Sequence, residues 1–503
     1  MSTLNGGAKG GDLVLTIGGY RRGVRALTRQ EKADIEAELT VTPRSKEGIP
    51  AKQSFPIYFR NGEYVYLPVE WATARYGPAV DERPRPAHLS GIQFTGELRE
   101  EQKEPAETLL RHFMGHSAEQ KKNEKGAGGV AVWPTGAGKT VLGAYLLAAL
   151  GVKTLIVVPR VIVGEAWREA LLQFTNLSDS HIGLLKGDSD ATAVALLRPV
   201  VIATIKGLYD KGLSSRDASS FGLTIYDECH KLPCEHYSEC LRRMSTKYRL
   251  GLTATPHRDD GCDSLNYLFI GPIVSEIKKT ENHRQPVVVQ LFRYPIDDRL
   301  KECPVNSLGK ADFTGVVGMV LDDKARNELL LSMVLRYAKE EARYILVLSS
   351  RREHAIVLAV AYTEACRRLE TAGSPASSSS SSSPLLLPEA TLCLGGIKKS
   401  ELNAVYQSRL IFATYDMCSD AFNYPALNTI ILAAPRAKME QTVGRILRQV
   451  HDVTPTVAEP YDAFHVLFAQ QKKKIKFYKE SGYTIEYMNA NESDVSETDA
   501  YDD

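Results

Sequence analysis

Cysteine is scarce in this sequence, which has eight among 503 residues. So few cysteines are too sparse for a disulfide framework, and no charged segment followed by an apolar one opens the chain. Long apolar runs are also missing, since the longest covers only residues 141–152. A run of this length is too short to span a bilayer and is typical of a buried helix. These absences predict a protein of a reducing, intracellular setting without a membrane role.

A strong excess of charge is absent as well, because the net charge is +1. The acidic residues are unevenly placed, and residues 485–503 hold seven of them with no Lys or Arg. The rest of the chain is mildly basic, with 62 basic side chains against 54 acidic ones. This balance permits a polyanionic partner such as nucleic acid but does not demand one.

Apolar strands alternate with helical patterns in two regions of the chain. The expected strands cover residues 129–133, 154–158, 200–203, 223–226 and 248–252, and then 344–348, 390–394, 409–413 and 429–433. Such alternation is typical of βαβ units around a parallel sheet. The predicted fold is therefore α/β, with two parallel-sheet domains in tandem.

Composition divides the chain further. The expected segments are an N-terminal accessory domain (1–89), a first sheet domain (90–274), a linker (275–290), a second sheet domain (291–470) and a basic, then acidic tail (471–503). Residues 371–388 include seven consecutive serines and flanking prolines. Such a stretch buries too little apolar surface to fold, so we expect a flexible surface loop, with a phosphorylated regulatory tract as the alternative.

A glycine-rich loop follows the first expected strand and opens an apolar helix. Residues 134–140 read Pro-Thr-Gly-Ala-Gly-Lys-Thr. Glycines let successive backbone N–H groups face one phosphate chain, and the helix N-terminus adds a positive dipole end. Lys139 would reach the β and γ phosphates of ATP, and the Thr140 hydroxyl would bind Mg²⁺. The predicted nucleotide contacts in this loop are Thr135, Gly136, Ala137, Gly138, Lys139 and Thr140.

An acidic pair follows the expected strand at 223–226, where the sequence reads Asp-Glu-Cys-His. Asp227 would hold the Mg²⁺ ion through water, and Glu228 would orient or deprotonate the attacking water. Two solvated acids at a strand end are the alternative for this pair. The neighbouring Cys229, His230, Cys234, His236 and Cys240 could also suggest zinc, although no CxxC pair occurs.

The order of short motifs resembles that of superfamily 2 helicases of the DEAD/DEAH-like type. Gln102, within residues 98–102, is similar to the Q motif that reads adenine in that family. Three further segments of the first domain resemble motif Ia (residues 157–160), the next strand-contacting motif (204–208) and motif III (252–256). Three segments of the second domain resemble motif IV (346–354), motif V (413–425) and motif VI (441–448). The resemblance covers roughly residues 90–450. The sequence around motifs IV to VI is similar to helicases of large DNA viruses, including the poxvirus transcript-release helicase, and to the helicase subunit of TFIIH.

This resemblance implies two RecA-like domains with ATP between them. Lys139, Asp227 and Glu228 would then act from the first domain. Arg445 and Arg448 from the second would stabilise charge on the phosphoryl group, while Gln441 would sense the γ-phosphate. The implied contacts to a nucleic-acid backbone are Arg160, Thr204, Ser350, Arg351 and Thr414. For Arg351, a solvated arginine at a helix start is an equal alternative.

The function implied is an ATP-dependent helicase or translocase, on DNA rather than RNA, working with the transcription or replication machinery. Motif V departs from the family, since Ala421 and Asn423 stand where Gly and Asp are usual. This departure favours an alternative, a catalytically weak nucleic-acid-binding subunit that uses ATP as a conformational switch. A P-loop kinase or a transporter ATPase is disfavoured by the second domain with its paired arginines.

Overall fold

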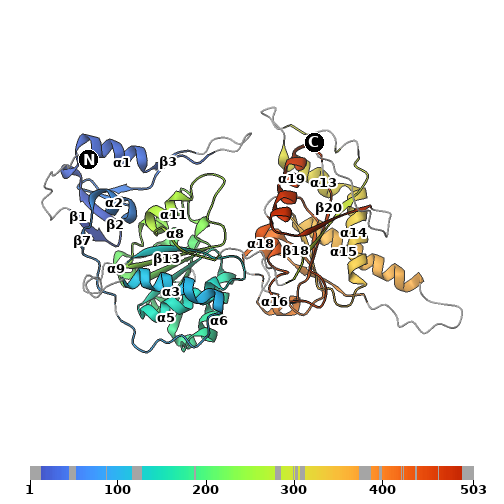
Figure 1. Cartoon of the computed structure of the whole chain (residues 1–503), viewed down its shortest axis with the longest axis horizontal. Helices are drawn as coiled ribbons and strands as arrows, with labels where there is room; N and C mark the ends of the chain where they lie inside the picture. The colour runs from blue at the N-terminus through green and yellow to red at the C-terminus, as the bar shows by residue number, and fades with distance from the viewer. Residues whose placement is uncertain are drawn as a thin grey trace. The chain divides into compact units, whose positions relative to one another are not determined.

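The computed structural model describes residues 13–44, 53–86, 88–115, 127–185, 189–277, 285–297, 300, 304–305, 312–372, 387–395, 399–420, 422, 424–436, 439–462 and 464–489. The chain divides into two compact units, Met1–Lys279 and Thr280–Asp503, whose elements are labelled in Figure 1. Each unit is built around its own seven-stranded sheet. Within the part of the chain that is described, no helix is long and apolar enough to cross a membrane.

The sheet of the first unit has the order β10-β11-β9-β12-β13-β8-β14, and all its strands are parallel. Its strands are β8 (Gly128–Val132), β9 (Thr154–Val158), β10 (Ile182–Leu184), β11 (Val200–Thr204), β12 (Leu223–Asp227), β13 (Tyr248–Thr253) and β14 (Ile273–Glu276). Five of them lie where apolar runs predicted strands. Strands that are covered on both faces read as near-continuous apolar runs, which is why these five were predictable.

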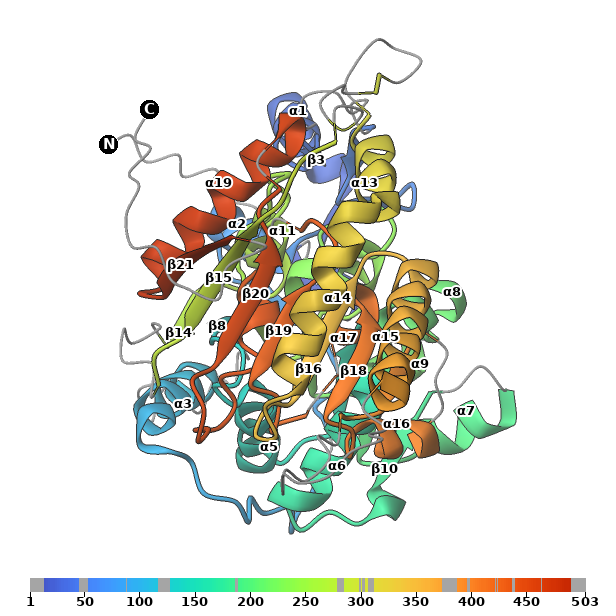
Figure 2. The same ribbon diagram turned by 90° about the vertical axis from the view of Figure 1, so that its right-hand side faces the viewer.

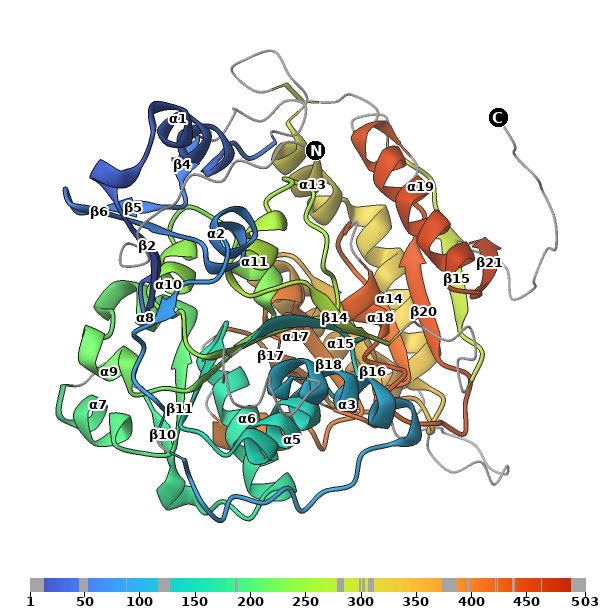
Figure 3. The ribbon, with the colours of Figure 1, turned by 60° about the vertical axis from the view of Figure 1, so that its left-hand side comes forward.

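Three helices lie together against one face of this sheet: α3 (Glu100–Met114), α5 (Lys139–Leu150) and α6 (Val161–Phe174) (Figure 3). Gly143 lets α5 and α6 approach closely, because a Cβ at this position would lie 2.4 Å from the Trp167 ring. The other helices are α7 (Ser189–Leu196), α8 (Ile205–Lys211), α9 (Ser215–Ser219), α10 (Ser238–Arg242) and α11 (Ser264–Phe269). This packing holds the loop before α5 at the carboxyl edge of the sheet.

The N-terminal segment forms a small mixed sheet of the order β5-β6-β2-β1-β7 and a short pair, β3 with β4. Its elements are β1 (Leu13–Thr16), β2 (Gly19–Gly23), α1 (Arg29–Glu38), β3 (Thr40–Val41), β4 (Phe55–Pro56), β5 (Phe59–Arg60), β6 (Tyr64–Leu67), α2 (Val69–Tyr76) and β7 (Val80–Asp81). Tyr20 and Val65 share one buried cluster with Val130 and Leu155 of the large sheet. The expected accessory domain is therefore packed into the first unit through a common core.

The sheet of the second unit has the order β17-β18-β16-β19-β20-β15-β21 and is also fully parallel. Its strands are β15 (Val288–Arg293), β16 (Ile345–Ser349), β17 (Ala390–Cys393), β18 (Leu410–Thr414), β19 (Thr429–Leu432), β20 (Thr456–Pro460) and β21 (Thr484–Asn489). Together the two sheets confirm the predicted tandem of RecA-like, parallel-sheet domains with a small N-terminal addition.

Two boundaries differ from the sequence prediction. β15 begins inside the expected linker, and the expected tail from residue 471 contains most of α19 (His465–Glu480) and all of β21. β21 pairs with β15 over six residues, from Val288↔Thr484 to Arg293↔Asn489. As an edge strand, β21 (Thr-Ile-Glu-Tyr-Met-Asn) mixes polar and apolar residues, so it lacks the apolar run that marks a central strand.

Helices α14 (Lys324–Ala338) and α15 (Arg352–Ala372) lie across one face of the second sheet (Figure 2). They bury Leu330, Met333 and Tyr362 against Val347 and Phe412 of the strands. The remaining helices are α13 (Phe313–Asp322), α16 (Lys399–Val405), α17 (Tyr415–Asp420) and α18 (Glu440–Val443). Residues 373–386, with the serine run, lie outside the described residues, so the predicted loop stays a prediction.

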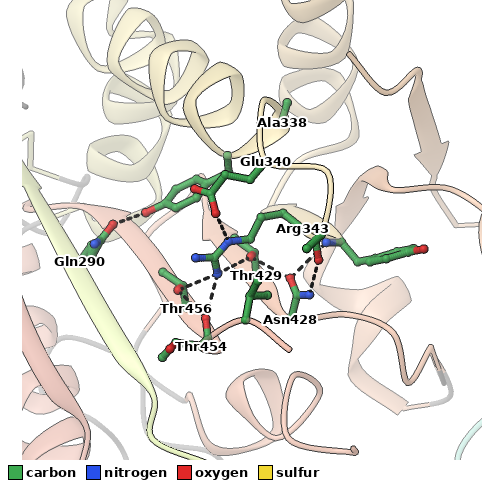
Figure 4. A network of polar contacts seen from close by, with 12 residues as sticks. Gln290, Ala338, Glu340, Arg343, Asn428, Thr429, Thr454 and Thr456 are labelled. Carbon is green, nitrogen blue, oxygen red and sulfur yellow. Dashed lines mark hydrogen bonds and ion pairs between the residues drawn. The ribbon is translucent and has the colours of Figure 1, made fainter. Parts of the chain in front are cut away.

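A polar network closes the amino end of the second sheet (Figure 4). Arg343 donates to the Thr454 carbonyl (2.8 Å) and to the hydroxyls of Thr456 (3.0 Å) and Thr429 (3.3 Å). Its Nε also donates to Glu340, at 2.8 Å. Asn428 joins the same end, because its amide nitrogen donates to the Ala342 carbonyl at 2.8 Å. These contacts tie the starts of β19 and β20 to the loop before β16, at the edge opposite the candidate site.

Candidate active site

The glycine-rich loop connects the end of β8 to the start of α5. Gly136 and Gly138 have φ values of 83° and 89°, in the left-handed region that favours glycine. This backbone curls around the N-terminus of α5, where Lys139 and Thr140 form the first turn. Lys139 Nζ lies 3.3 Å from the Trp133 carbonyl oxygen and donates to it. The loop thus has the backbone form that a phosphate chain requires.

Gln102 is buried in α3 and contacts this loop directly. Its Nε2 donates to the Ala137 carbonyl at 2.7 Å, and its Oε1 accepts from the Arg99 N–H at 2.8 Å. A Cβ at Gly138 would lie 2.3 Å from the same Nε2 atom, so the glycine also makes room for the amide. In this structure Gln102 braces the phosphate loop, while its predicted contact with adenine stays a prediction.

Asp227 is the last residue of β12 and is almost fully buried. Its Oδ2 accepts from the indole Nε1 of Trp167 at 2.8 Å, and its Oδ1 accepts from the Glu228 N–H at 3.0 Å. Burial, together with the neighbouring charge of Glu228, raises the pKa of the Asp227 carboxyl to about 6. The two hydrogen bonds fix the orientation of the carboxylate at the carboxyl edge of the sheet.

Glu228 has a φ of 49°, the one positive value for a non-glycine among the residues that the structure describes. Such a conformation costs about 1–3 kcal/mol and must be held by its surroundings. Burial raises the pKa of Glu228, but His230 and Lys139 outweigh burial and leave this pKa below its usual value. His230 Nδ1 lies 3.3 Å from Glu228 Oε2 and 3.0 Å from the Thr253 hydroxyl, which links this turn to β13.

The residues present fit a nucleoside triphosphate with a divalent cation. Glu228 Oε2 is buried and lies 3.3 Å from His230 Nδ1, a nitrogen that also lies 3.0 Å from the Thr253 hydroxyl, so this carboxylate oxygen keeps acceptor capacity inside the site. Lys139 and Thr140 stand at the N-terminus of α5, which follows β8. Asp227 ends β12, which is separated from β8 by β13, and Glu228 follows Asp227 directly. A cationic amine, a hydroxyl and two carboxylates at one sheet edge form the donor set that Mg²⁺-triphosphate chemistry needs.

The structure does not bring the Cys/His neighbours of the acidic pair together as ligands. Cys229 is buried in the core, His236 faces the Tyr209 hydroxyl at 3.2 Å, and Cys240 lies 3.7 Å from the Ile205 carbonyl. Among the described residues, no group of three or more His, Cys, Asp or Glu could hold a metal ion. Burial raises the pKa of the Cys240 thiol to about 12, which further disfavours a thiolate ligand.

Two residues at this site escaped the sequence analysis. Trp167 holds Asp227 from α6, and Arg258 Nη1 donates to the His230 carbonyl at 2.5 Å while pairing with Asp260 at 2.6 Å. Nothing in the local sequence marks Trp167 as a site residue, because a tryptophan in an apolar helix is typical of the hydrophobic core. Arg258 follows motif III by two residues, and that closeness was the one available signal.

The two predicted nucleic-acid contacts of the first unit share the carboxyl edge of the sheet with this site. Thr204 pairs in register with Val158, so Arg160 and Thr204 leave neighbouring strands at the same edge. Arg160 is exposed at the start of α6, whereas the Thr204 hydroxyl caps α8 by accepting from the Gly207 N–H at 3.0 Å. The cap orients the first turn of α8 toward this edge.

The second unit places its predicted contacts in the same way. Ser349 pairs in register with Thr414, so the turn after β16 and the end of β18 are neighbours. Ser350 and Arg351 are exposed on that turn. Thr414 is buried, and its hydroxyl accepts from the Met417 N–H at 3.4 Å. The turn is therefore more accessible to a backbone phosphate than the Thr414 side chain is.

The motif VI arginines lie after α18 and differ in their contacts. Arg445 is buried, and its Nη1 donates to the Phe422 carbonyl at 2.5 Å, which joins motif VI to motif V. Burial and the charge of Arg445 lower the pKa of Arg448 to about 10, so the Arg448 guanidinium keeps its charge at neutral pH. Gln441 lies in α18, but its side chain is outside the described part of the chain.

Comparison with known proteins agrees with this geometry. Residues 95–258 match the family model of the type III restriction enzyme res subunit. Over 471 residues the chain is 25% identical to a mimivirus protein named "Putative ATP-dependent RNA helicase L396", covering 92% of this chain and 84% of that one. It is 38% identical to the DNA 3'-5' helicase XPB of Mycobacterium tuberculosis, over 29% of this chain and 27% of the relative.

Among solved structures, a fragment described as a "putative HsdR subunit" of a type I restriction enzyme from Vibrio vulnificus superposes with a TM-score of 0.51. Its sequence identity is 15%, over 79% of this chain and 70% of that one, so this likeness concerns the fold alone. With the motif order, the matched family and the two parallel sheets taken together, the chain is an ATP-dependent helicase of superfamily 2, a nucleoside-triphosphate hydrolase related to viral proteins named as helicases and to the XPB and Rad25 DNA helicases.

Proposed function

We propose that this protein moves along a nucleic-acid strand, DNA in preference to RNA, by coupling ATP hydrolysis to alternate binding and release by two motor domains, one around each seven-stranded sheet. The observation that carries the proposal is the carboxyl edge of the first sheet. There the phosphate loop, the acidic pair and two candidate strand contacts share one edge. A transcription or replication step is the setting we propose for this motor, with the viral and XPB-type relatives as its support.

In this proposal each residue of the first unit has a distinct task. Lys139 neutralises the β and γ phosphates, and Thr140 with Asp227 holds Mg²⁺, which would supply charge neutralisation at the phosphates. Glu228, with a pKa below its usual value, is a carboxylate at neutral pH and can accept a proton from the attacking water. Trp167 and Gln102 keep the carboxylate and the loop in position.

The second unit would supply the charges that complete the reaction. Arg448 stabilises the transferring phosphoryl group, Arg445 supports it through motif V, and Gln441 senses the γ-phosphate. Ser350, Arg351 and Thr414 would contact strand phosphates, together with the equivalent edge of the first unit. Backbone contacts of this kind carry no base information, so little sequence preference is expected.

Steady-state ATPase rates test the proposal, measured with Mg²⁺ and without nucleic acid, then with single-stranded DNA, duplex DNA or RNA. We expect the largest stimulation with single-stranded DNA and no turnover in Lys139→Ala. Lys153→Ala is the matched control, because its Nζ bonds the Leu196 carbonyl (2.6 Å) at the opposite edge of the sheet. A Lys139→Ala protein with normal turnover, or wild-type turnover indifferent to every nucleic acid, contradicts the proposal.

A second candidate is a nucleic-acid-binding subunit that uses ATP as a switch and hydrolyses it poorly. The observation in its favour is motif V, where Ala421 and Asn423 replace the usual Gly and Asp. Both residues lie outside the part of the chain that the structure describes. A single turnover per binding event, with ATP-dependent affinity for DNA, would favour the switch over the motor.

A further inference from the structure

A continuous chain of hydrogen bonds lies behind the exposed turn at 349–351. The Arg351 N–H donates to Ser349 Oγ at 3.3 Å, and Ser349 Oγ lies 2.8 Å from His354 Nδ1. On its other side, His354 Nε2 lies 2.9 Å from Asn327 Oδ1, and Asn327 Nδ2 donates to the Leu321 carbonyl at 2.8 Å. The chain therefore runs from the turn, through α15 and α14, to the end of α13.

Every donor and acceptor in this chain is matched for one tautomer of the histidine. Ser349 accepts from the backbone N–H, so its hydroxyl proton is available to His354 Nδ1. His354 then carries its proton on Nε2 and donates it to the Asn327 carbonyl oxygen. A second ring proton would leave Ser349 facing two donors with no acceptor for its own proton. The arrangement thus needs a neutral imidazole.

The surroundings keep the imidazole neutral. His354 is 6% exposed, and burial lowers its pKa to about 4, with Arg326 and Arg351 acting in the same direction. We call this chain of hydrogen bonds, which joins Arg351, Ser349, His354 and Asn327, the His354 relay. Because the imidazole stays neutral, the relay has one proton arrangement across the physiological pH range. Neither Ser349 nor Asn327 has an alternative role in the proposed chemistry.

This chain of hydrogen bonds ends at the backbone N–H of Arg351, and both Arg351 and its neighbour Ser350 are exposed. The Arg351 guanidinium rests over α13, where its Nη2 lies 3.1 Å from the position that a Cβ of Gly318 would take. A side chain at Gly318 would therefore push against the arginine. The backbone of the turn is therefore held by a hydrogen bond and the guanidinium lies beside α13, although the turn itself faces solvent.

We propose that His354 is a positioning residue for nucleic-acid binding: through Ser349 it fixes the turn that presents Ser350 and Arg351 to a strand phosphate. The inference rests on the proposed function, because it assumes that this turn contacts nucleic acid. A fixed turn loses less conformational freedom on binding than a mobile one, so the relay raises affinity without touching the strand.

The test is His354→Phe in the full chain, which keeps an aromatic ring in the buried site and removes both hydrogen bonds. We expect the concentration of oligodeoxythymidylate that half-saturates the ATPase to rise about three- to tenfold, the effect of one lost hydrogen bond, while the saturated rate changes less. Oligouridylate provides the RNA arm. Tyr362→Phe is the matched control, since it removes one hydrogen bond (2.9 Å, to the Pro388 carbonyl) from the same helix, away from the turn. It should leave half-saturation unchanged.

A double-mutant cycle with Arg351→Ala separates positioning from general destabilisation. If His354 acts through the turn, His354→Phe has little further effect on affinity once Arg351 is gone. Thermal unfolding of each variant identifies loss of fold, and His354→Gln, which keeps one donor and one acceptor, should recover part of the affinity. Equal half-saturation in wild type and His354→Phe, or fully additive losses in the cycle, overturns the inference. Wild-type protein that binds neither oligonucleotide overturns the proposed function itself.

Discussion

The carboxyl edges of the two large sheets are built differently. At the first edge, Glu228 is strained, its buried Oε2 has only His230 Nδ1 at 3.3 Å beside it, and Asp227 is buried next to it. At the second edge, two buried networks are hydrogen-bonded throughout. Arg326 and Asp462 form a buried pair with N–O distances of 2.8 and 2.9 Å, and the His354 relay is complete.

The same fold can therefore either keep buried acceptors for a ligand or hold its buried groups in one fixed geometry. Unsatisfied buried acceptors cost stability, so they persist where a ligand will use them. Saturated networks instead hold their members in one geometry, which suits residues that must point outward or support a turn. In the proposed function, the first unit would carry the reacting groups and the second a rigid frame for the groups that assist.

The largest expected effect tests this division, because the proposed function places Arg448, a group that assists the reaction, on the second unit. Arg448→Ala should lower ATP turnover by about 10³-fold or more, the scale of a lost arginine finger, while ATP affinity changes less. Turnover and nucleotide binding are measured separately on the same preparation. Arg448→Lys, which keeps the charge but not the planar guanidinium, is the control and should recover only part of the rate. A normal rate in Arg448→Ala removes motif VI from the catalytic account.

The next effect sharpens the description of the first edge. Glu228→Gln should reduce hydrolysis by about 10²–10⁴-fold, because the amide cannot accept a proton from the attacking water. ATP should still bind to the variant, and titration with a fluorescent ATP analogue measures this binding. The strain at φ 49° is unchanged in this variant, so thermal stability should differ little. Rapid hydrolysis by Glu228→Gln would assign the base to another residue.

A substitution that breaks the buried Arg326–Asp462 pair tests whether the second unit is a rigid frame. Asp462→Asn leaves the Arg326 guanidinium buried with a neutral partner, and we expect a loss of about 3–5 kcal/mol in unfolding free energy. Chemical denaturation measures this loss. Lys324→Gln on the same helix is the control, because Lys324 is exposed, lies 3.7 Å from Glu328, and should cost less than about 1 kcal/mol. Equal stability of Asp462→Asn and wild type would mean that this pair is not part of a rigid frame.

The amino end of the second sheet should matter for stability but not for catalysis. Arg343→Met removes the hydrogen bonds to Thr429, Thr454 and Thr456, at a cost of about 1–3 kcal/mol. The folded variant should hydrolyse ATP at the wild-type rate, because this network lies at the edge opposite the site. If the fully folded variant hydrolysed ATP more slowly than the wild type, the network at the amino end of the sheet would affect catalysis, which would contradict this prediction.

The smallest effect concerns coupling. Ala421→Gly with Asn423→Asp restores the usual motif V residues, and we expect the ratio of stimulated to basal ATPase to rise a few-fold, because glycine frees the turn and a carboxylate accepts stronger hydrogen bonds. Basal turnover should move less than the stimulated rate. An unaltered ratio would show that Ala and Asn already suit the local backbone.

Contiguous features of the chain were predictable from the sequence by itself. Nine strands were expected where β8, β9, β11, β12, β13, β16, β17, β18 and β19 lie. All but β17, which lies at the edge of its sheet, are central strands, and central parallel strands are apolar on both faces. The phosphate loop and the acidic pair were expected for a similar reason, since each is a short run of neighbouring residues. Local order along the chain was enough to place Asp227 at a strand end and Lys139 at the start of the helix after a strand.

Only the tertiary structure decided what depends on contacts between distant residues. β15 and β21 pair across 196 positions, Trp167 reaches Asp227 across 60, and Arg326 reaches Asp462 across 136. The His354 relay likewise needs α14 to present Asn327 beside α15. None of these contacts has a local pattern, because hydrogen-bond partners are chosen by the packing of helices on the sheet. The physical reason is that a side chain's role depends on what the fold places within about 3 Å of it.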